Sequence, residues 1–476
     1  MAIRKVNKFM IKRILSGMLA AGIVSTMAVG MTGCGDSSDP GNKDGDVNFG
    51  GKTLTIASWV DFEPELGKSE SEDAAYYALQ QAMEKFNVKV QWNITTQENH
   101  FSQFQAKSLS GLVYADIVLS HSWNHVSLIS QGLQTPLDEY YDAMSEEEKS
   151  HWDMELSKFG DHYYGLSPKS NVTLPIACMF YNRTRLKELK LQDPQELARQ
   201  GKWTWDKFHE YCKAATDAAS EKYGLSMYNM YNVLGGGNNV KTVVFDETDG
   251  KYYNGFTHGD EAAKNMQCLE FLTNMSKDKI VYGDWIQGSE AMDDAENAFL
   301  DGQTLFTFAQ NGARLKKLGM TDFGVVTTPI ADFNTDQSLY NLMESFTYWM
   351  IPSKTNFPAA DIFEFWAYAQ NTWDKDRGDA YYEFNLDNYK EEQLDLNYTD
   401  MKDVEFLVEM SEKVVVKPSL DLSCSLGDLV ANGIYCEVIS GNATPAAAVA
   451  AKDNEIQAKI DEALNSAAKD EGSSGS

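Results

Sequence analysis

The sequence predicts an α/β protein in which helices cover mainly parallel sheets. Between residues 53 and 119, short apolar strands alternate with amphipathic helices, which is the pattern of a doubly wound sheet. The same kind of alternation starts again at residue 177. A chain of 476 residues is also too long for a single hydrophobic core. We therefore expect two α/β domains.

The first block of the pattern contains three strands and two helices. Residues 53–58 form a short predicted strand, and residues 88–94 alternate between apolar and polar side chains as a second strand. A helical stripe of apolar residues over 75–86 separates these two strands, and an amphipathic stretch over 99–109 follows them. The run 116–119 is apolar enough to be a strand buried on both faces.

The second block has the same character. Predicted strands cover residues 177–181, 305–308, 323–326 and 348–351, and predicted helices cover residues 260–275, 295–300 and 361–368. A further helix is expected to begin at Trp205 with Thr204 as its N-cap. We expect Trp203 and Trp205 to pack in a core rather than to bind a ligand.

The first 33 residues have the composition of an export signal. Five basic residues precede an apolar run over 14–31, which ends in small residues before Cys34. The run Met31-Thr32-Gly33-Cys34 resembles the bacterial lipobox, and this resemblance implies acylation of Cys34. Two acyl chains hold a protein on a membrane where one chain binds only marginally. The alternative is an uncleaved membrane helix, although glycine, serine and threonine dilute the apolar run.

The two ends of the chain are predicted to be flexible outside the signal. Residues 34–50 consist largely of turn formers and acids, which is typical of a flexible tether. Residues 467–476 are predicted to be a disordered tail on composition.

The charge of the chain excludes nucleic acid as a partner. The sequence has 41 basic and 70 acidic residues, a net charge of −29. Removal of the signal would take away five bases and no acid, which leaves 36 bases against 70 acids and a net charge of −34. Such a surface repels phosphate backbones and anionic lipid headgroups.

No motif in the sequence selects a metal or a catalytic centre. Five cysteines follow Cys34 without a C-x-x-C pair or a histidine at zinc spacing, and a bridge between Cys424 and Cys436 is left open. Gly-x-Ser-x-Gly and His-Glu-x-x-His are both missing, and paired carboxylates of a glycosidase are not excluded. We expect no catalytic residue, no metal and no cofactor.

Two stretches resemble known loops without completing their patterns. Residues 235–242 look like a phosphate-binding loop, but Val240 stands where the glycine before lysine is required, so a flexible loop near the cleft is expected. Residues 246–250 are acidic enough for a calcium turn, yet the distal Glu of the longer motif is missing. A plain hairpin turn is favoured there.

The ends of the predicted strands nominate a binding site. In open α/β sheets, ligands bind beyond the carboxyl ends of the strands. This rule selects Trp59 and Asp61 after the first strand, and His121 and Trp123 after the third. Taken alone, each of these residues is more simply a surface or packing residue, whereas two tryptophans at neighbouring strand ends favour a site.

Several short motifs occur in an order that resembles one protein family. They are Ala115-Asp116-Ile117-Val118, Gly132-Leu133-Gln134-Thr135-Pro136-Leu137-Asp138, Tyr164-Gly165-Leu166, Phe180-Tyr181-Asn182, Trp205-Asp206-Lys207-Phe208, Phe299-Leu300-Asp301-Gly302-Gln303, Phe323-Gly324-Val325 and Ser440-Gly441-Asn442-Ala443-Thr444-Pro445. Together with the lipobox, they resemble family 1 of the extracellular solute-binding proteins of ABC importers, which mostly carry sugars.

The resemblance implies a two-lobed fold of the periplasmic binding protein kind, with a hinge and an interlobe cleft. Both lobes are then discontinuous in sequence. On this alignment, lobe one comprises residues 51–168 with 308–353, and lobe two comprises residues 169–307 with 354–466. Closure over a ligand would be a hinge motion.

A sugar offers an apolar face and a fringe of hydroxyls, so aromatic plates and polar side chains hold it. The candidates for stacking are Trp59, Trp123, Tyr228 and Tyr231, and the candidates for hydrogen bonding are Asp61, His121, Asn171, Asn229 and Asn311. The sequence departs from the family pattern at Gly312, where sugar binders often place a tryptophan.

The sequence as a whole predicts a lipid-anchored, monomeric receptor on the extracellular face of the membrane. The resemblance implies that it captures a small solute, which we expect to be an oligosaccharide, and delivers it to an ABC permease. Two alternatives from other classes are a secreted carbohydrate-acting enzyme and a surface adhesin. An enzyme would turn its substrate over, whereas a receptor would leave the ligand intact.

Overall fold

The computed structural model describes residues 47–226, 231–282, 289–308, 312–343, 346–421 and 423–465. The predicted signal, Cys34 and the predicted tail at 467–476 lie outside these residues. No helix in the described ranges is both long enough and apolar enough to cross a bilayer.

Four strands form the first sheet, in the order β13-β3-β1-β2. Strand β1 (Thr53–Ser58) runs parallel to β2 (Lys89–Ile94) and to β3 (Ile117–His121). Strand β13 (Thr347–Met350) pairs with β3 in the antiparallel sense. The three strands predicted in the first block are therefore confirmed, and their carboxyl ends lie at one edge.

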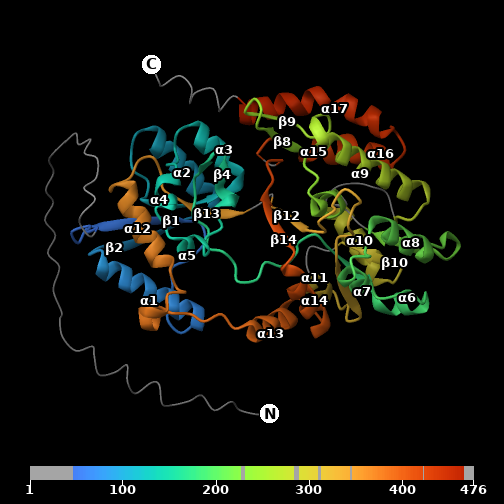
Figure 1. Ribbon diagram of the computed structural model, residues 1–476, viewed down its shortest axis with the longest axis horizontal. Coiled ribbons are helices and arrows are strands. Elements are labelled where there is room, and N and C mark those ends of the chain that lie inside the picture. The colour runs from blue at the N-terminus through green and yellow to red at the C-terminus, as the bar shows by residue number, and fades with distance from the viewer. Residues whose placement is uncertain are drawn as a thin grey trace, which may run out of the picture. The chain divides into compact units, whose positions relative to one another are not determined.

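Helices cover both faces of this sheet. Helices α1 (Glu70–Lys85) and α12 (Ala359–Gln370) lie side by side and share a core with Leu54 and Ile56 of β1 (Figure 1). On the other face, Ala57 belongs to a second core with Phe104 of α2 (Gln97–Leu109) and residues of α3 (Ser122–Ser130). Successive β1 residues thus enter opposite cores, as a doubly wound sheet requires.

The second sheet has the order β11-β6-β10-β7. Strands β10 (Thr304–Thr307) and β7 (Tyr223–Ser226) are parallel, whereas β6 (Cys178–Asn182) is antiparallel to both β10 and β11 (Phe323–Thr327). One large core surrounds this sheet.

The remaining helical elements and short strands connect and flank these two sheets. They are α4 (Asp138–Asp142), α5 (Glu146–Lys149), η2 (Glu155–Ser157), β4 (Lys158–Phe159), β5 (His162–Tyr163), α6 (Arg183–Glu188), α7 (Pro194–Arg199), α8 (Trp205–Ala215), η3 (Ala218–Ser220), η4 (Tyr231–Gly235), η5 (Gly236–Asn238), β8 (Val243–Asp246), β9 (Lys251–Asn254), α9 (Gly259–Lys277), α10 (Ser289–Leu300), α11 (Gly312–Lys317), β12 (Leu339–Met343), η6 (Lys375–Ala380), α13 (Leu386–Leu396), α14 (Met401–Ser411), β14 (Val414–Pro418), α15 (Gly427–Val430), η7 (Ala431–Cys436), α16 (Glu437–Ile439), α17 (Pro445–Ile460) and η8 (Asp461–Asn465).

The long-range placement of two elements differs from the expected lobe assignment. The alignment puts segment 308–353 in lobe one, but β11 within it hydrogen bonds to β6 of the second sheet. The alignment puts segment 354–466 in lobe two, but Ile362 and Trp366 of α12 pack in the core of the first sheet. The physical reason is that a short apolar strand or helix fits either core, and only its long-range partners select one.

The predicted tether is too long at its carboxyl end. Phe49 is buried, its backbone N–H donates to Phe86 O at 2.9 Å, and its ring meets the ring of Phe357 at 4.8 Å. Residues 47–50 therefore belong to the folded body.

The glycine-rich stretch after residue 235 is packed in the core of the second sheet. Asn238 is buried, and its amide nitrogen donates to Leu234 O at 2.8 Å and Pro329 O at 3.0 Å. A Cβ at Gly237 would lie 2.7 Å from Cγ2 of Thr328, so only glycine fits. Residues 235–242 were expected to form a flexible loop near the cleft. That expectation is wrong, because Gly237 and Asn238 are enclosed by neighbouring residues.

The acidic stretch 246–250 is the turn of a hairpin between β8 and β9, as predicted. Its carboxylates have partners within the hairpin region. Asp246 Oδ2 lies 2.8 Å from His258 Nε2, and Asp249 Oδ2 accepts from the Tyr253 hydroxyl at 2.5 Å. Cys424 and Cys436 form no disulfide.

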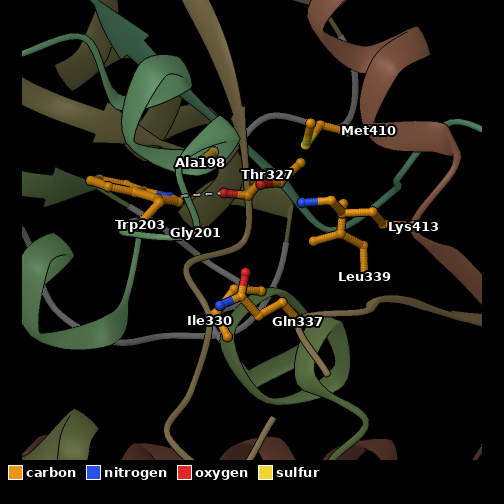
Figure 2. A pocket seen from close by; sticks show the side chains of 9 residues that line it. All are labelled: Ala198, Gly201, Trp203, Thr327, Ile330, Gln337, Leu339, Met410 and Lys413. Carbon is orange, nitrogen blue, oxygen red and sulfur yellow. Dashed lines mark hydrogen bonds between the residues drawn. The ribbon is translucent and has the colours of Figure 1, made fainter. Parts of the chain in front are cut away.

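The two tryptophans around Thr204 pack as predicted. The Thr204 side chain caps α8 by accepting from Lys207 N, and Trp203 is buried with its Nε1 donating to Thr327 O at 3.1 Å. Figure 2 shows this bond at the side of a small pocket that Lys413 also lines. The pocket has a volume of about 10 Å³, which is room for about one water and not for a ligand.

Candidate functional site

Three of the predicted site residues meet at the carboxyl edge of the first sheet. Parallel strands β1 and β3 end at Ser58 and His121, and Trp59 follows the first of them directly. The Trp59 and His121 ring centroids are 6.3 Å apart, and those of His121 and Trp123 are 4.0 Å apart. We call Trp59, His121 and Trp123 the strand-end cluster.

Helix α3 fixes the geometry of the strand-end cluster. His121 is the residue before this helix, and its Nδ1 accepts a hydrogen bond from the backbone N–H of Trp123 at 3.3 Å. Burial lowers the pKa of His121, which favours the neutral ring that can accept in this way. Trp123 remains 49% exposed beside it. A half-exposed indole next to a buried ring is a suitable plate for the apolar face of a ligand.

Trp59 packs against two aromatic residues of α2. Its ring lies 5.0 Å from Phe101 and 5.2 Å from His100, centroid to centroid. His100 is itself buried and its Nε2 lies 2.8 Å from Leu119 O. Trp59 therefore has a packing role as well as a position at the strand ends.

Asp61 lies in the exposed loop between β1 and α1. Its Oδ1 accepts from the backbone N–H of Glu63 at 3.2 Å, which folds the loop into a local turn. Asp61 belongs to the same loop as Trp59, and no ion pair of the described residues uses its carboxylate. Asp61 thus offers an acceptor near the strand-end cluster.

Two exposed apolar side chains at the carboxyl edge of the first sheet were not among the site residues predicted from the sequence. Phe62 is 49% exposed, and its ring lies edge-on to Trp349 of β13 at 5.9 Å. Ile94 is also exposed at the end of β2, where it pairs in register with Ser58. The alternation in residues 88–94 was a signal for Ile94, whereas no periodicity marks Phe62 in its loop.

Asn171 is not joined to the strand-end cluster. It is exposed in the segment between β5 and β6, and no hydrogen bond or ring contact of the described residues links it to the cluster. Its role in binding stays a prediction.

The other candidates follow two neighbouring strands of the second sheet. Tyr228, Asn229 and Asn311 lie outside the described residues, as does the side chain of Tyr231. The strands that precede them in the chain, β7 and β10, are parallel and end in register at Ser226 and Thr307.

A second feature that sequence reasoning missed is a guanidinium after β10. Arg314 of α11 donates from Nε to Glu296 and from Nη2 to Asp293, both on α10. Burial raises the pKa of Glu296, and the Arg314 charge opposes that shift. The Arg314 side chain is 33% exposed. Its guanidinium group is therefore in contact with solvent as well as with the two carboxylates. Its signal in the sequence is only its position soon after a strand.

The close approach of the backbone at Asn397 explains why this chain has glycine at position 312, where sugar binders often place a tryptophan. A Cβ at this position would lie 2.0 Å from the carbonyl oxygen of Asn397. A tryptophan cannot occupy position 312 unless the segment at Asn397 moves.

The described residues offer no metal site. No group of three or more His, Cys, Asp and Glu side chains in these ranges is arranged to hold an ion.

Comparison with protein families identifies the class of protein. The model of the bacterial extracellular solute-binding proteins matches residues 67–372. The chain belongs to this family. No match is found among the curated proteins with which the sequence was compared.

Solved structures share the fold at low sequence identity. A sugar transporter from Rhizobium etli in an open conformation aligns with a TM-score of 0.56 and 14% identity, covering 86% of this chain and 98% of that one. The cyclic α-maltosyl-1,6-maltose binding protein of Arthrobacter globiformis aligns with a TM-score of 0.54 and 15% identity, covering 86% and 99%. The maltose-binding protein of Listeria monocytogenes, in complex with maltose, aligns with a TM-score of 0.52 and 15% identity, covering 90% of this chain and 99% of that one. The protein therefore has the two-lobed α/β fold of the periplasmic binding proteins.

Proposed function

We propose that this protein is a lipid-anchored receptor that captures an oligosaccharide outside the cell and delivers it to the permease of an ABC importer. The observation that carries the proposal is the strand-end cluster, in which Trp123 is held half exposed at the carboxyl edge of the first sheet. Membership of an extracellular solute-binding family supports capture of a solute. Two proteins of the same fold bind maltose and cyclic maltosyl-maltose.

The chemistry of the edge suits a sugar. The indole of Trp123 and the exposed ring of Phe62 offer flat apolar surfaces, and Asp61 offers an acceptor for hydroxyl groups. From the second lobe, we propose that Arg314 donates to the ligand. Asn171, Tyr228, Asn229, Tyr231 and Asn311 remain further proposed contacts.

We propose that the ligand shifts the protein toward a closed form by binding it better than the open form. With the strand pairing taken into account, lobe one would comprise residues 47–168 with 347–380, and lobe two residues 178–330 with 397–465. The segments between these ranges would include the hinge. Strand β12 lies within one of these segments, 331–346, and pairs in parallel with β14, which follows another, 381–396.

We propose that Cys34 is acylated and that residues 35–46 tether the folded body to the outer face of the membrane. The protein would act as a monomer, without a cofactor, and would leave its ligand chemically unchanged.

Calorimetry with maltose and maltotetraose tests this function. Trp123→Ala should weaken binding by about 1–3 kcal/mol, the usual cost of losing a central aromatic contact. Phe245→Ala is the matched control, because Phe245 is an exposed aromatic residue on the β8 hairpin. The proposal fails for these sugars if wild type binds neither, or if both variants lose affinity equally. Recovery of intact sugar after long incubation separates a receptor from an enzyme.

A further inference from the structure

A polar concavity lies at the amino-terminal end of α1. It has a volume of about 710 Å³, and segment 379–388 forms its other side. Its lining includes the carboxylates of Glu70 and Asp73 from α1, and of Asp379 and Glu383 from that segment. No lysine or arginine lines it, and none of these four carboxylates forms an ion pair within the described part of the chain.

Aromatic rings complete the wall of the concavity. Tyr381, Tyr382 and Phe384 line it and are all partly exposed. The Tyr381 ring already faces an ammonium group, since Lys375 Nζ lies 5.6 Å from its centroid. Carboxylates and aromatic faces together recognise organic cations, because the ring face and the anion attract the same positive charge.

Helix α13 continues from the concavity, contacts α14 through partly buried side chains, and has no fully buried residue. None of the side chains of Leu386–Leu396 is buried, and Leu386 and Leu396 are 39% and 53% exposed. Asn385 caps the helix, and Lys316 Nζ donates to Leu394 O at 3.0 Å near its other end. An isolated helix of this length is marginal in water, and helices in proteins gain most of their stability from packing an apolar face.

The helix adds the same sign of charge to the surface. Asp387, Glu391, Glu392 and Asp395 project from it, and Lys390 is its one base, 3.7 Å from Asp387. The concavity and α13 share Asn388 and thus form one acidic and partly apolar surface. We call this surface the α13 face.

We propose that the α13 face docks a basic segment of a partner protein, whose lysine or arginine side chains enter the concavity and whose apolar side chains cover the leucines of α13. A helix of this length spans roughly 16 Å at 1.5 Å per residue. An extended segment needs about five residues to cover that distance, so a polypeptide fits the whole surface where a small cation fits only the concavity. Anionic lipid is disfavoured by the charge. The proposal does not depend on which solute the strand-end cluster binds.

Fluorescence anisotropy with a labelled peptide of sequence Lys-Leu-Lys-Lys-Leu-Lys tests the proposal. Glu383→Lys with Glu391→Lys should weaken peptide binding at least tenfold. The matched control is Glu139→Lys with Glu147→Lys, which changes net charge equally at exposed acids of α4 and α5. Equal loss in both double variants, or no binding by wild type, would overturn the proposal.

Two further measurements distinguish a peptide site from a small-cation site. Leu396→Ser should weaken the leucine-containing peptide about threefold and leave a peptide with glycine in place of leucine unaffected. If spermidine competes as well as the peptide at equal charge, the surface is a small-cation site and the proposal is wrong. Maltotetraose binding is measured separately on the wild-type protein, because residues 381–396 lie between the proposed lobes and their variants can also change closure. If the wild-type protein does not bind maltotetraose, that result counts against the proposed function and not against peptide binding at the α13 face.

Discussion

The Nδ1 atom of His125 and the hydroxyl oxygen of Tyr348 lie 2.6 Å apart in the interior of the first lobe, where both side chains are buried. Gln134 Nε2 donates to the same hydroxyl at 3.0 Å. We assign the Tyr348 proton to the bond with Nδ1, which requires a neutral His125 ring. Burial lowers the pKa of His125 to about 4.

This neutral histidine should make folding sensitive to acid. Below pH 6.5 the unfolded chain takes up a proton at His125 and the folded protein does not, so the free energy of unfolding falls between pH 6.5 and pH 4. The contribution of His125 to this fall is about 3 kcal/mol. In His125→Asn, the amide oxygen can still accept from Tyr348, and the fall should be smaller by that amount. Urea unfolding at several pH values measures it, and a His125 ring that titrates near 6.5 by NMR would contradict it.

A buried acid in the second lobe should have the opposite effect. Asp403 Oδ1 accepts from Arg183 Nη2 at 2.8 Å and Gln195 Nε2 at 2.7 Å, yet burial outweighs these bonds and raises the pKa of Asp403 to about 6. The folded protein then binds the extra proton between pH 6 and 3.8, so this site adds stability on acidification that is lost as pH rises through 6. Its size is about 3 kcal/mol.

The Asp403 prediction has two checks. Asp403→Asn should remove the gain and leave the full acid-induced loss from His125 visible. Arg183→Met should destabilise the protein at pH 7 by about 3–5 kcal/mol, because the buried carboxylate loses its cation. A pH profile of Asp403→Asn that matches wild type would show that folding does not raise the pKa of Asp403.

The local elements of the fold were predictable because their signals are local. The alternation in 88–94 and the cap at Thr204 depend on neighbours within a few residues, and both are confirmed. The sheet that a strand joins depends on partners far along the chain. Residues 323–326 and 348–351 are equally apolar, yet β11 joins the second sheet and β13 the first.

The site was predictable only in part for a similar reason. The strand-end rule found Trp59, His121 and Trp123 because it depends on strand order, and the structure brings these rings together. It could not find Phe62, whose exposure depends on the path of an irregular loop. It also could not find Arg314, whose position depends on carboxylates of α10.

The two tryptophans of the strand-end cluster should respond differently to truncation. Trp59→Ala should lower both sugar affinity and stability, the latter by about 1–3 kcal/mol, because the indole packs on Phe101 and His100. Trp123→Ala should lower affinity and change stability by no more than about 0.5 kcal/mol, since half of this side chain is exposed. Calorimetry and urea unfolding on both variants measure the difference. Equal loss of stability would show that Trp123 also supports the core.

Closure should be visible as compaction. If the two lobes close on a sugar, small-angle scattering of the protein from residue 35 onward should give a smaller radius of gyration with bound maltotetraose. Thermal stability should rise at the same time, by about 2.7 kcal/mol when the free sugar is at a hundred times its dissociation constant. A sugar that shows no heat of binding serves as the control. Stabilisation without compaction would argue against hinge motion.

Membrane attachment should depend on one cysteine. Cys34 is the cysteine that ends the lipobox-like run, and two acyl chains on it would supply stable attachment where a single chain would not. Cys34→Ala should therefore abolish palmitate labelling in cells, and the protein should appear in the medium or accumulate unprocessed. Cys436→Ala is the matched control, because Cys436 is partly exposed in the folded body and should not affect labelling. Palmitate that stays on the Cys34→Ala protein would place the lipid elsewhere and remove the basis for the proposed anchor.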